Sequence, residues 1–193
     1  MRGRPKSIEE DKLISSAQDI FWKKGYSATS LKDLCIATKA GAGSLYNRFK
    51  GGKKELFKKA LQQRRKDLHQ FKHQLQEGEN PIKLIKAFFQ NVALANEQDH
   101  LKGCIVANTL IEMTFVDDDL QEEAISILKE TEQLYTAIIR EEQQKGNLQT
   151  SLAPEVLGKY LITFWCGINS LRRMYPDKNI LKEQIALHLQ MIK

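Results

Sequence analysis

Apolar side chains recur along nearly the whole chain at the three- and four-residue spacing of amphipathic helices, and the alternation typical of β-strands is absent. Residues that favour helix ends, such as serine, asparagine, aspartate, proline and glycine, separate the apolar stretches. Together these patterns predict about nine helices, which begin near residues 7, 30, 42, 53, 80, 104, 117 and 154 and after Pro176. The expected fold class is therefore all-α.

Two of the predicted helices are short and lie together between residues 30 and 49. Each has only enough apolar residues to pack on one neighbour, namely Leu31, Leu34 and Cys35 in the first and Leu45 and Phe49 in the second. With the helix that begins at residue 7 they would form a helix-turn-helix, whose last helix presents its outer face to the DNA major groove. That face would carry Ala42, Gly43, Ser44, Tyr46, Asn47 and Arg48. The alternative is an ordinary helix with a solvated face.

The distribution of charge favours the DNA-binding interpretation. Residues 1–54 contain 12 of the 30 Lys and Arg residues but only 5 of the 24 Asp and Glu residues, so the net charge of +6 comes from the first quarter of the chain. A basic segment attached to a near-neutral remainder is typical of a module that binds a polyanion. A surface that merely promotes solubility is the alternative for charge taken by itself.

Other classes of function find little support in the sequence. The apolar stretches are too short to cross a bilayer, and the charged N-terminus does not resemble a secretory signal. The three cysteines form no C-x-x-C pair, which favours a cytoplasmic protein without disulfides or structural zinc. His69 and His73 have a spacing that can bind metal, but no third ligand lies near them in the sequence. No nucleotide-binding or hydrolase motif is present, so we predict neither a cofactor, nor a metal, nor an enzyme.

Several short motifs, taken together, resemble the DNA-binding domain of the TetR family of transcriptional regulators: Gly25-Tyr26, Thr29-Ser30, Leu34, residues 43–49 and residues 53–57. The resemblance covers about residues 7–60. It implies a helix-turn-helix domain in residues 1–52 and a helical ligand-binding and dimerisation domain in residues 53–193. The chain departs from the family pattern at Lys39, where a turn glycine is usual, at Cys35, where alanine is usual, and at Gly51-Gly52, which lengthens a loop by one residue.

The resemblance also implies roles for individual residues of the first domain. Phosphate contacts are expected from Lys32, Ser44, Tyr46 and Lys53. Contacts with the bases are expected from Ala42, Gly43, Asn47 and Arg48. The basic residues 2–6 could lie in the adjacent minor groove, or they could be an untethered tail.

For the second domain, the resemblance implies a homodimer formed by the helix that begins at Pro154 and by the last helix. Candidate ligand contacts are polar or aromatic residues within apolar stretches: Phe88, Cys104, Asn108, Glu112, Tyr160, Thr163 and Trp165, with Phe89, Thr109 and Asn169 as further candidates. Each could instead be an ordinary core residue. The function predicted is that of a homodimeric repressor, released from double-stranded operator DNA by a small apolar or electrophilic inducer. The alternatives are a constitutive architectural DNA-binding protein and a helical-bundle enzyme.

Overall fold

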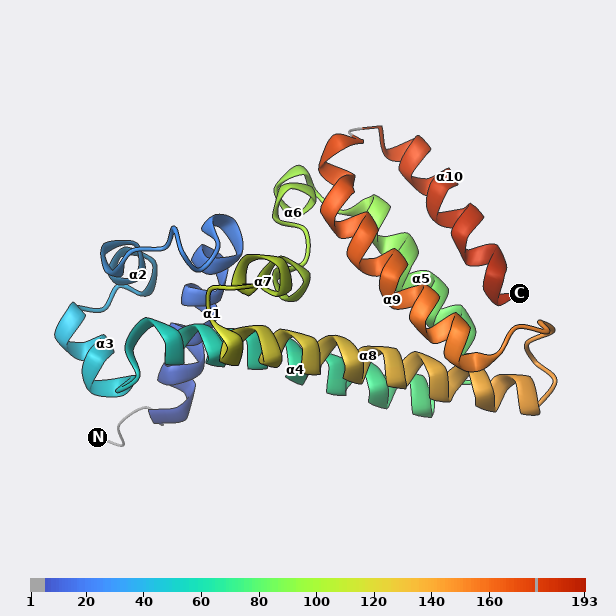
Figure 1. Cartoon of the computed structure of the whole chain (residues 1–193), viewed down its shortest axis with the longest axis horizontal. Helices are drawn as coiled ribbons and strands as arrows, with labels where there is room; N and C mark the ends of the chain where they lie inside the picture. The colour runs from blue at the N-terminus through green and yellow to red at the C-terminus, as the bar shows by residue number, and fades with distance from the viewer. Residues whose placement is uncertain (1–5, 176) are drawn as a thin grey trace.

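The computed structural model describes residues 6–175 and 177–193, with side chains from Glu10 onward, so residues 2–5 of the basic N-terminal segment lie outside it. Within the described residues the chain forms ten α-helices, two short 3-10 helices and no β-strand (Figure 1). The predicted all-α fold is confirmed. All nine predicted helices are present, and a short polar segment forms one more, α6 (Glu97–Lys102).

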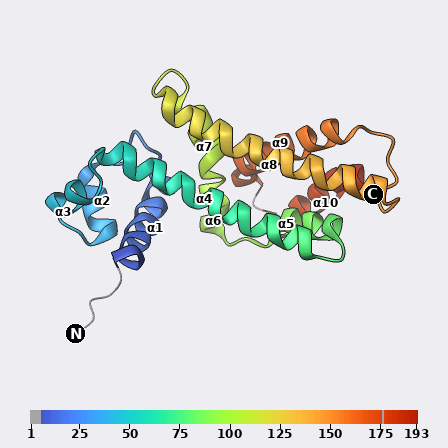
Figure 2. The same cartoon turned by 90° about the horizontal axis from the view of Figure 1, so that it is seen from below.

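Three helices make up one end of the molecule: α1 (Lys6–Lys24), α2 (Leu31–Thr38) and α3 (Ala42–Arg48) (Figures 1 and 2). Ser30 begins α2 through a reciprocal cap, since its hydroxyl accepts the Asp33 N–H at 3.1 Å and the Asp33 carboxylate accepts the Ser30 N–H at 2.9 Å. Phe21, Leu45 and Phe49 are buried where the three helices meet. We call this unit the head.

Two long helices, α4 (Gly52–Glu77) and α8 (Asp118–Gln144), run side by side in the same direction along the molecule (Figure 1). The far end contains α5 (Pro81–Leu94), α9 (Pro154–Leu171) and α10 (Lys178–His188), with the 3-10 helices Arg172–Met174 and Leu189–Ile192. The helix starts expected near residues 80 and 117 are capped by side chains: Asn80 accepts the Lys83 N–H at 2.8 Å, and Asp117 accepts the Leu120 N–H at 3.1 Å.

The short helix α7 (Ile105–Met113) lies between the head and the far end. The apolar character of residues 104–115 predicts burial on most sides. Cys104, Ile105 and Val106 are indeed buried, but Ile111 is 70% exposed and Phe115 is 100% exposed. The expectation is wrong at Ile111, on the outer side of α7, and at Phe115, which follows the end of the helix, whereas Thr109 and Met113 are buried.

Packing is continuous across residue 52, where the sequence predicted a domain boundary. The hydrophobic cluster of the head includes Phe57 and Leu61 of α4, Met113 of α7 and Leu120 of α8. A second cluster joins the end of α4 to α5, α8, α9 and α10. Because α4 contributes to both clusters, it joins the head to the far end as one rigid element, and the division at residue 52 stays a prediction.

Candidate nucleic-acid interface and ligand cavity

Helix α3 has the two faces that its sequence predicted. Leu45 and Phe49 are 4% and 1% exposed and fix the helix to the head. The opposite side exposes Ala42, Gly43, Ser44, Tyr46 and Asn47, with Arg48 half-buried at its edge, and Lys32 is exposed on α2. Tyr46 is 50% exposed although it is a large aromatic residue. The predicted DNA-reading face is therefore assembled, and its contacts with DNA stay a prediction.

The longer Gly51-Gly52 loop fits around Tyr46. Gly52 has φ +64°, and a Cβ atom at this position would lie 3.3 Å from Cε1 of Tyr46. The Gly51 N–H donates to the Glu55 carboxylate at 2.8 Å, which holds the loop against the first turn of α4. Glycine at residue 52 thus permits both the left-handed backbone and the close approach of the Tyr46 ring.

Lys53 occupies a different environment from the one expected for a phosphate contact. Its ammonium donates to the carbonyl oxygens of Tyr26 at 2.9 Å and Thr29 at 3.0 Å, and it lies 4.3 Å from the centre of the Tyr26 ring. These contacts fasten the turn after α1 to the start of α4. A phosphate contact by Lys53 stays a prediction, and only the third ammonium proton is available for it while both bonds persist.

Lys39 replaces the family's turn glycine and still adopts the glycine-like backbone, with φ +55° and ψ +29°. The left-handed region places the Cβ atom of an L-residue close to the following carbonyl oxygen. The turn between α2 and α3 therefore holds a non-glycine residue in the left-handed region and is strained.

Glu112 connects α7 to the head. Its carboxylate accepts the backbone N–H groups of Tyr26 at 3.0 Å and Ser27 at 2.7 Å. Gly25 has φ +80° and leaves room for this carboxylate, because a Cβ atom there would lie 2.9 Å from a Glu112 oxygen. Glu112 was expected to contact a ligand, but both oxygens hold the turn that follows α1.

A cavity of about 150 Å³ lies between α4, α5, α7, α8 and α9. Three residues predicted to contact a ligand line it: Phe88, Cys104 and Trp165. The rest of its wall consists of Arg64, Asp67, Leu68, Phe71, Val106, Ile127, Leu128, Thr131, Tyr135 and Ile162. The Phe88 ring stacks on Phe71 and on Trp165, with 4.8 Å between ring centres in both pairs. The cavity is thus largely apolar, with an aromatic wall.

The remaining predicted ligand contacts do not meet at this cavity. Asn108 donates to the Lys102 carbonyl at 3.0 Å, Tyr160 bonds to Nδ1 of His188 at 2.5 Å, and Thr163 is exposed. Thr109 and Asn169 donate to carbonyls one turn earlier in their own helices, and Phe89 packs in the core of the far end. Local hydrogen bonds thus satisfy Thr109 and Asn169 within their own helices, and the ligand contacts predicted for the residues outside this cavity stay predictions.

Sequence reasoning missed the cavity residues of α4 and α8, including Leu68, Phe71 and Tyr135. Leu68 and Phe71 belong to the apolar stripe of α4, and nothing in that stripe distinguishes a cavity wall from a filled core. The available signal was Tyr135, a hydroxyl-bearing residue among the apolar positions of α8.

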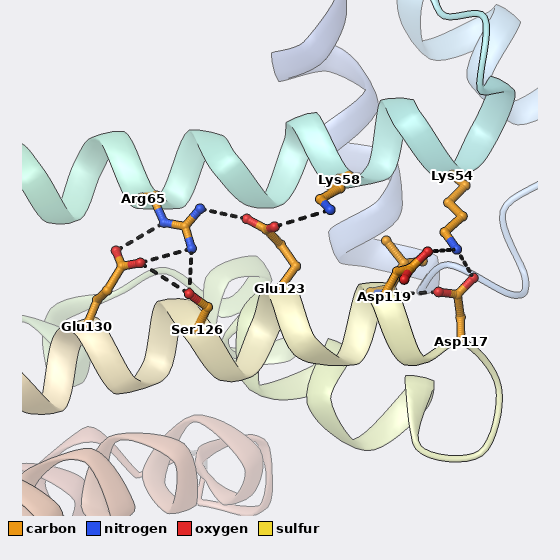
Figure 3. A network of polar contacts seen from close by, with 9 residues as sticks. Lys54, Lys58, Arg65, Asp117, Asp119, Glu123, Ser126 and Glu130 are labelled. Carbon is orange, nitrogen blue, oxygen red and sulfur yellow. Dashed lines mark hydrogen bonds and ion pairs between the residues drawn. The ribbon is translucent and has the colours of Figure 1, made fainter.

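Ion pairs hold α4 beside α8 (Figure 3). The Lys54 ammonium lies 2.9 Å from Asp117 and 2.7 Å from Asp119, and hydrogen bonds to Asp119 and Asp117 raise the pKa of Lys54. About three turns further along α4, Arg65 bonds Glu123 at 2.8 Å and Glu130 at 3.0 Å. Partly exposed pairs stabilise little individually, about 0–1 kcal/mol. Their spacing along both helices nevertheless fixes the register of α4 on α8.

Metal and membrane sites find no support in the part of the chain that the structure describes. No three His, Cys, Asp or Glu side chains are grouped there to hold a metal ion, and His73 lies 2.9 Å from Glu77 instead. Cys35, Cys104 and Cys166 are all free thiols. No helix among these residues combines the length and apolar character needed to span a bilayer.

Comparisons with known proteins agree with this arrangement. Residues 13–60 match the family model described as bacterial regulatory proteins of the tetR family, and residues 81–187 match the tetracyclin repressor-like C-terminal domain. The transcriptional repressor DhaR of Mycobacterium sp. (strain GP1) is 27% identical over 170 residues, which cover 86% of this chain and 82% of DhaR. The repressor ComR of Escherichia coli (strain K12) is 37% identical over 113 residues, which cover 55% of this chain and 52% of ComR.

Solved structures share the fold across nearly the whole chain. Reduced NemR of E. coli has a TM-score of 0.83 at 19% identity, with 96% of this chain and 97% of NemR covered. The TetR-family regulator CifR, complexed with a 26-bp operator duplex, has a TM-score of 0.78 at 22% identity, with 99% of this chain and all of CifR covered. Given matching models for both the head and most of the remaining helices, the chain belongs to the TetR family of bacterial transcriptional regulators, which are not enzymes.

Proposed function

We propose that the protein is a transcriptional repressor that leaves its operator when a small apolar molecule enters the cavity beside α4. As a TetR-family regulator it binds double-stranded operator DNA as a homodimer. Its DNA target implies that it acts in the cytoplasm. The exposed face of α3 would read the major groove, with half-sites about 34–36 Å apart or a multiple of that distance.

The observation that carries this proposal is the position of α4. Leu68 and Phe71 of α4 line the cavity, while Phe57 and Leu61 of the same helix are buried in the cluster of the head. A molecule that fills the cavity presses on the later turns of α4, and the rigid helix transmits the displacement to its first turns. The head is packed on those turns, so its orientation changes with them.

Helix α7 offers a second connection between cavity and head. Cys104 and Val106, at its start, line the cavity, and Glu112, near its end, holds the backbone of Tyr26 and Ser27. A ligand changes operator affinity only through its different affinities for the two arrangements of the heads. A coupling free energy of about 1–3 kcal/mol, typical of allosteric proteins, changes operator affinity about 5–150-fold.

Dimerisation would use the exposed apolar side chains of α9 and α10. Val156, Leu171, Ile180 and Leu187 are between 48% and 63% exposed in the single chain. Leu187→Glu should therefore give a monomer with weakened operator binding, whereas Lys182→Glu, on an exposed position of the same helix, should leave a dimer. Sedimentation velocity of both variants tests this assignment, and a dimeric Leu187→Glu protein contradicts it.

The release mechanism can be tested without knowing the ligand. Val106→Phe places a larger side chain in the cavity wall, whereas Val116→Phe makes the same change at a position that is 61% exposed. We expect Val106→Phe to weaken operator binding by at least about fivefold, as a bound ligand would, and Val116→Phe to bind as the parent does. Thr131→Phe, from the α8 side of the cavity, is an independent second variant.

Equal operator affinity for the parent and for both folded cavity variants would contradict ligand release and favour a constitutive architectural protein.

A separate comparison tests whether electrophiles release the operator by reacting with Cys104. Cys104 is 9% exposed and faces the cavity, so an electrophile must enter the cavity to reach it. If reaction with the thiol drives release, Cys104→Ser abolishes the response to electrophiles and keeps the response to unreactive apolar compounds.

A further inference from the structure

The hydroxyl of Tyr135 is the unusual feature of the cavity. Tyr135 is 1% exposed, and its ring lies 6.1 Å from that of Phe89. Burial and the nearby Cys104, rather than a hydrogen bond from any described residue, govern the environment of its hydroxyl. The hydroxyl is not one of the fully buried polar atoms without a partner, so it keeps contact with open space where Tyr135 lines the cavity. Burial raises the pKa of Tyr135, so the phenol keeps its proton at neutral pH. A protonated donor without a protein partner therefore borders the cavity.

The other polar groups of the wall are already paired or lie at its edge. The Thr131 hydroxyl donates to the Ile127 carbonyl at 2.9 Å. Arg64 and Asp67 form an ion pair at 3.0 Å, and their side chains are 30% and 45% exposed. The interior thus offers a ligand one strong hydrogen-bond donor, the phenol of Tyr135, beside the weakly polar thiol of Cys104.

These surroundings restrict the chemistry of the ligand. An ionised ligand would have no opposite charge inside the cavity, because Arg64 and Asp67 neutralise one another at the edge. An alcohol could accept the Tyr135 proton, but its own hydroxyl proton would then need an acceptor, and Thr131 offers it only the remaining lone pairs of an oxygen whose orientation is set by donation to the Ile127 carbonyl. A carbonyl oxygen accepts a hydrogen bond and brings no proton of its own.

Shape adds a further restriction. The stacked rings of Phe71, Phe88 and Trp165 form a broad aromatic wall that favours a flat partner. An apolar cavity of about 150 Å³ is large enough for a molecule the size of benzene. We infer that the cavity takes a neutral, planar carbonyl compound of about the size of a substituted benzene, whose oxygen accepts a hydrogen bond from the hydroxyl of Tyr135. This inference rests on the proposed ligand-released function and names the class of ligand.

Four probes of similar size separate the features of this ligand: acetophenone carries the carbonyl, α-methylstyrene lacks an acceptor, 1-phenylethanol adds a hydroxyl proton, and benzoate adds charge. Their binding to the full-length dimer is measured by titration calorimetry. Acetophenone should bind the parent protein roughly fivefold to tenfold more tightly than α-methylstyrene, the worth of one neutral hydrogen bond. We expect 1-phenylethanol and benzoate to bind more weakly than acetophenone, benzoate by at least about tenfold.

The matched variants are Tyr135→Phe, which removes only the hydroxyl, and Tyr160→Phe, whose hydroxyl bonds to His188 away from this cavity. Tyr135→Phe should abolish the preference for acetophenone over α-methylstyrene, and Tyr160→Phe should keep it. The infrared carbonyl band of acetophenone provides a measurement on the unmodified protein. Hydrogen bonding to Tyr135 should shift this band to lower frequency on binding, and an unshifted band overturns the inference even if Tyr135→Phe does not fold.

The outcomes distinguish this inference from the function on which it rests. If acetophenone and α-methylstyrene bind the parent equally and Tyr135→Phe changes neither affinity, the ligand class is wrong and the cavity remains a ligand site. If no probe binds while Val106→Phe still weakens operator binding, the class is wrong and ligand release stands. If acetophenone binds through Tyr135 but neither it nor Val106→Phe alters operator affinity, the class stands and ligand release is wrong.

Discussion

Replacing Lys39 by glycine should stabilise the protein, since Lys39 is a non-glycine residue in the left-handed region at φ +55°. That conformation costs an L-residue about 1–2 kcal/mol. Glycine avoids this cost but loses about 0.5–1 kcal/mol more conformational entropy on folding. The net gain expected for Lys39→Gly is about 0.5–1 kcal/mol, or about 1–4 °C in Tm for a chain of this size.

Lys39→Ala is the matched control, because it removes the same exposed charge and keeps a Cβ atom in the strained turn. Both variants are compared with the parent by thermal and urea unfolding at equal protomer concentration, since the stability of a dimer depends on concentration. Lys39→Gly should be more stable than Lys39→Ala by the same net amount, about 0.5–1 kcal/mol. Equal stability of the two variants would refute the assignment of strain to this turn.

Three further outcomes are expected. Tyr46→Ala should weaken binding to all DNA sequences, whereas Asn47→Ala should change base preference by about 1–3 kcal/mol at one position, which selection from a randomised operator library distinguishes. Glu112→Gln should reduce the ligand-induced change in operator Kd and leave ligand affinity unaltered. An undiminished change would show that Glu112 does not connect the cavity to the head. The pKa of Asp33 is lowered by its hydrogen bonds from Lys24 and Ser30, so its stabilisation is present above about pH 4 and is lost as pH falls below that. Asp33→Asn should therefore lower stability at neutral pH and flatten its acid dependence in equilibrium unfolding.

Features encoded by neighbouring residues were predicted well from the sequence. The inner pair Leu45 and Phe49 followed from helical spacing alone, and it fixed which face of α3 would be exposed. The Asn80 and Asp117 caps were equally local, because the capping side chain and the N–H that it accepts lie three residues apart. For the same reason the sequence predicted nearly all of the exposed residues of the candidate DNA-reading face.

Features that depend on long-range packing were not predicted. Glu112 and Tyr26 lie 86 residues apart, and no periodicity along the chain could show that they meet. Lys53 was assigned by the family pattern to DNA, and its bonds to the carbonyls of Tyr26 and Thr29 depend on how α4 packs on the head. Tyr135 belongs to a regular apolar stripe, and only the packing of α4, α7 and α9 leaves space around it.

The central claim is that filling the cavity moves the two heads of the dimer relative to one another. Ala28 is exposed on the head, so a spin label attached through Ala28→Cys, with the three native cysteines changed to serine, reports the distance between heads by double electron–electron resonance. With Val106→Phe, this distance should change by more than about 2 Å, the scale of helix shifts in allosteric switching, whereas Val116→Phe should leave it unchanged. Identical distance distributions for the parent and both variants would contradict the account.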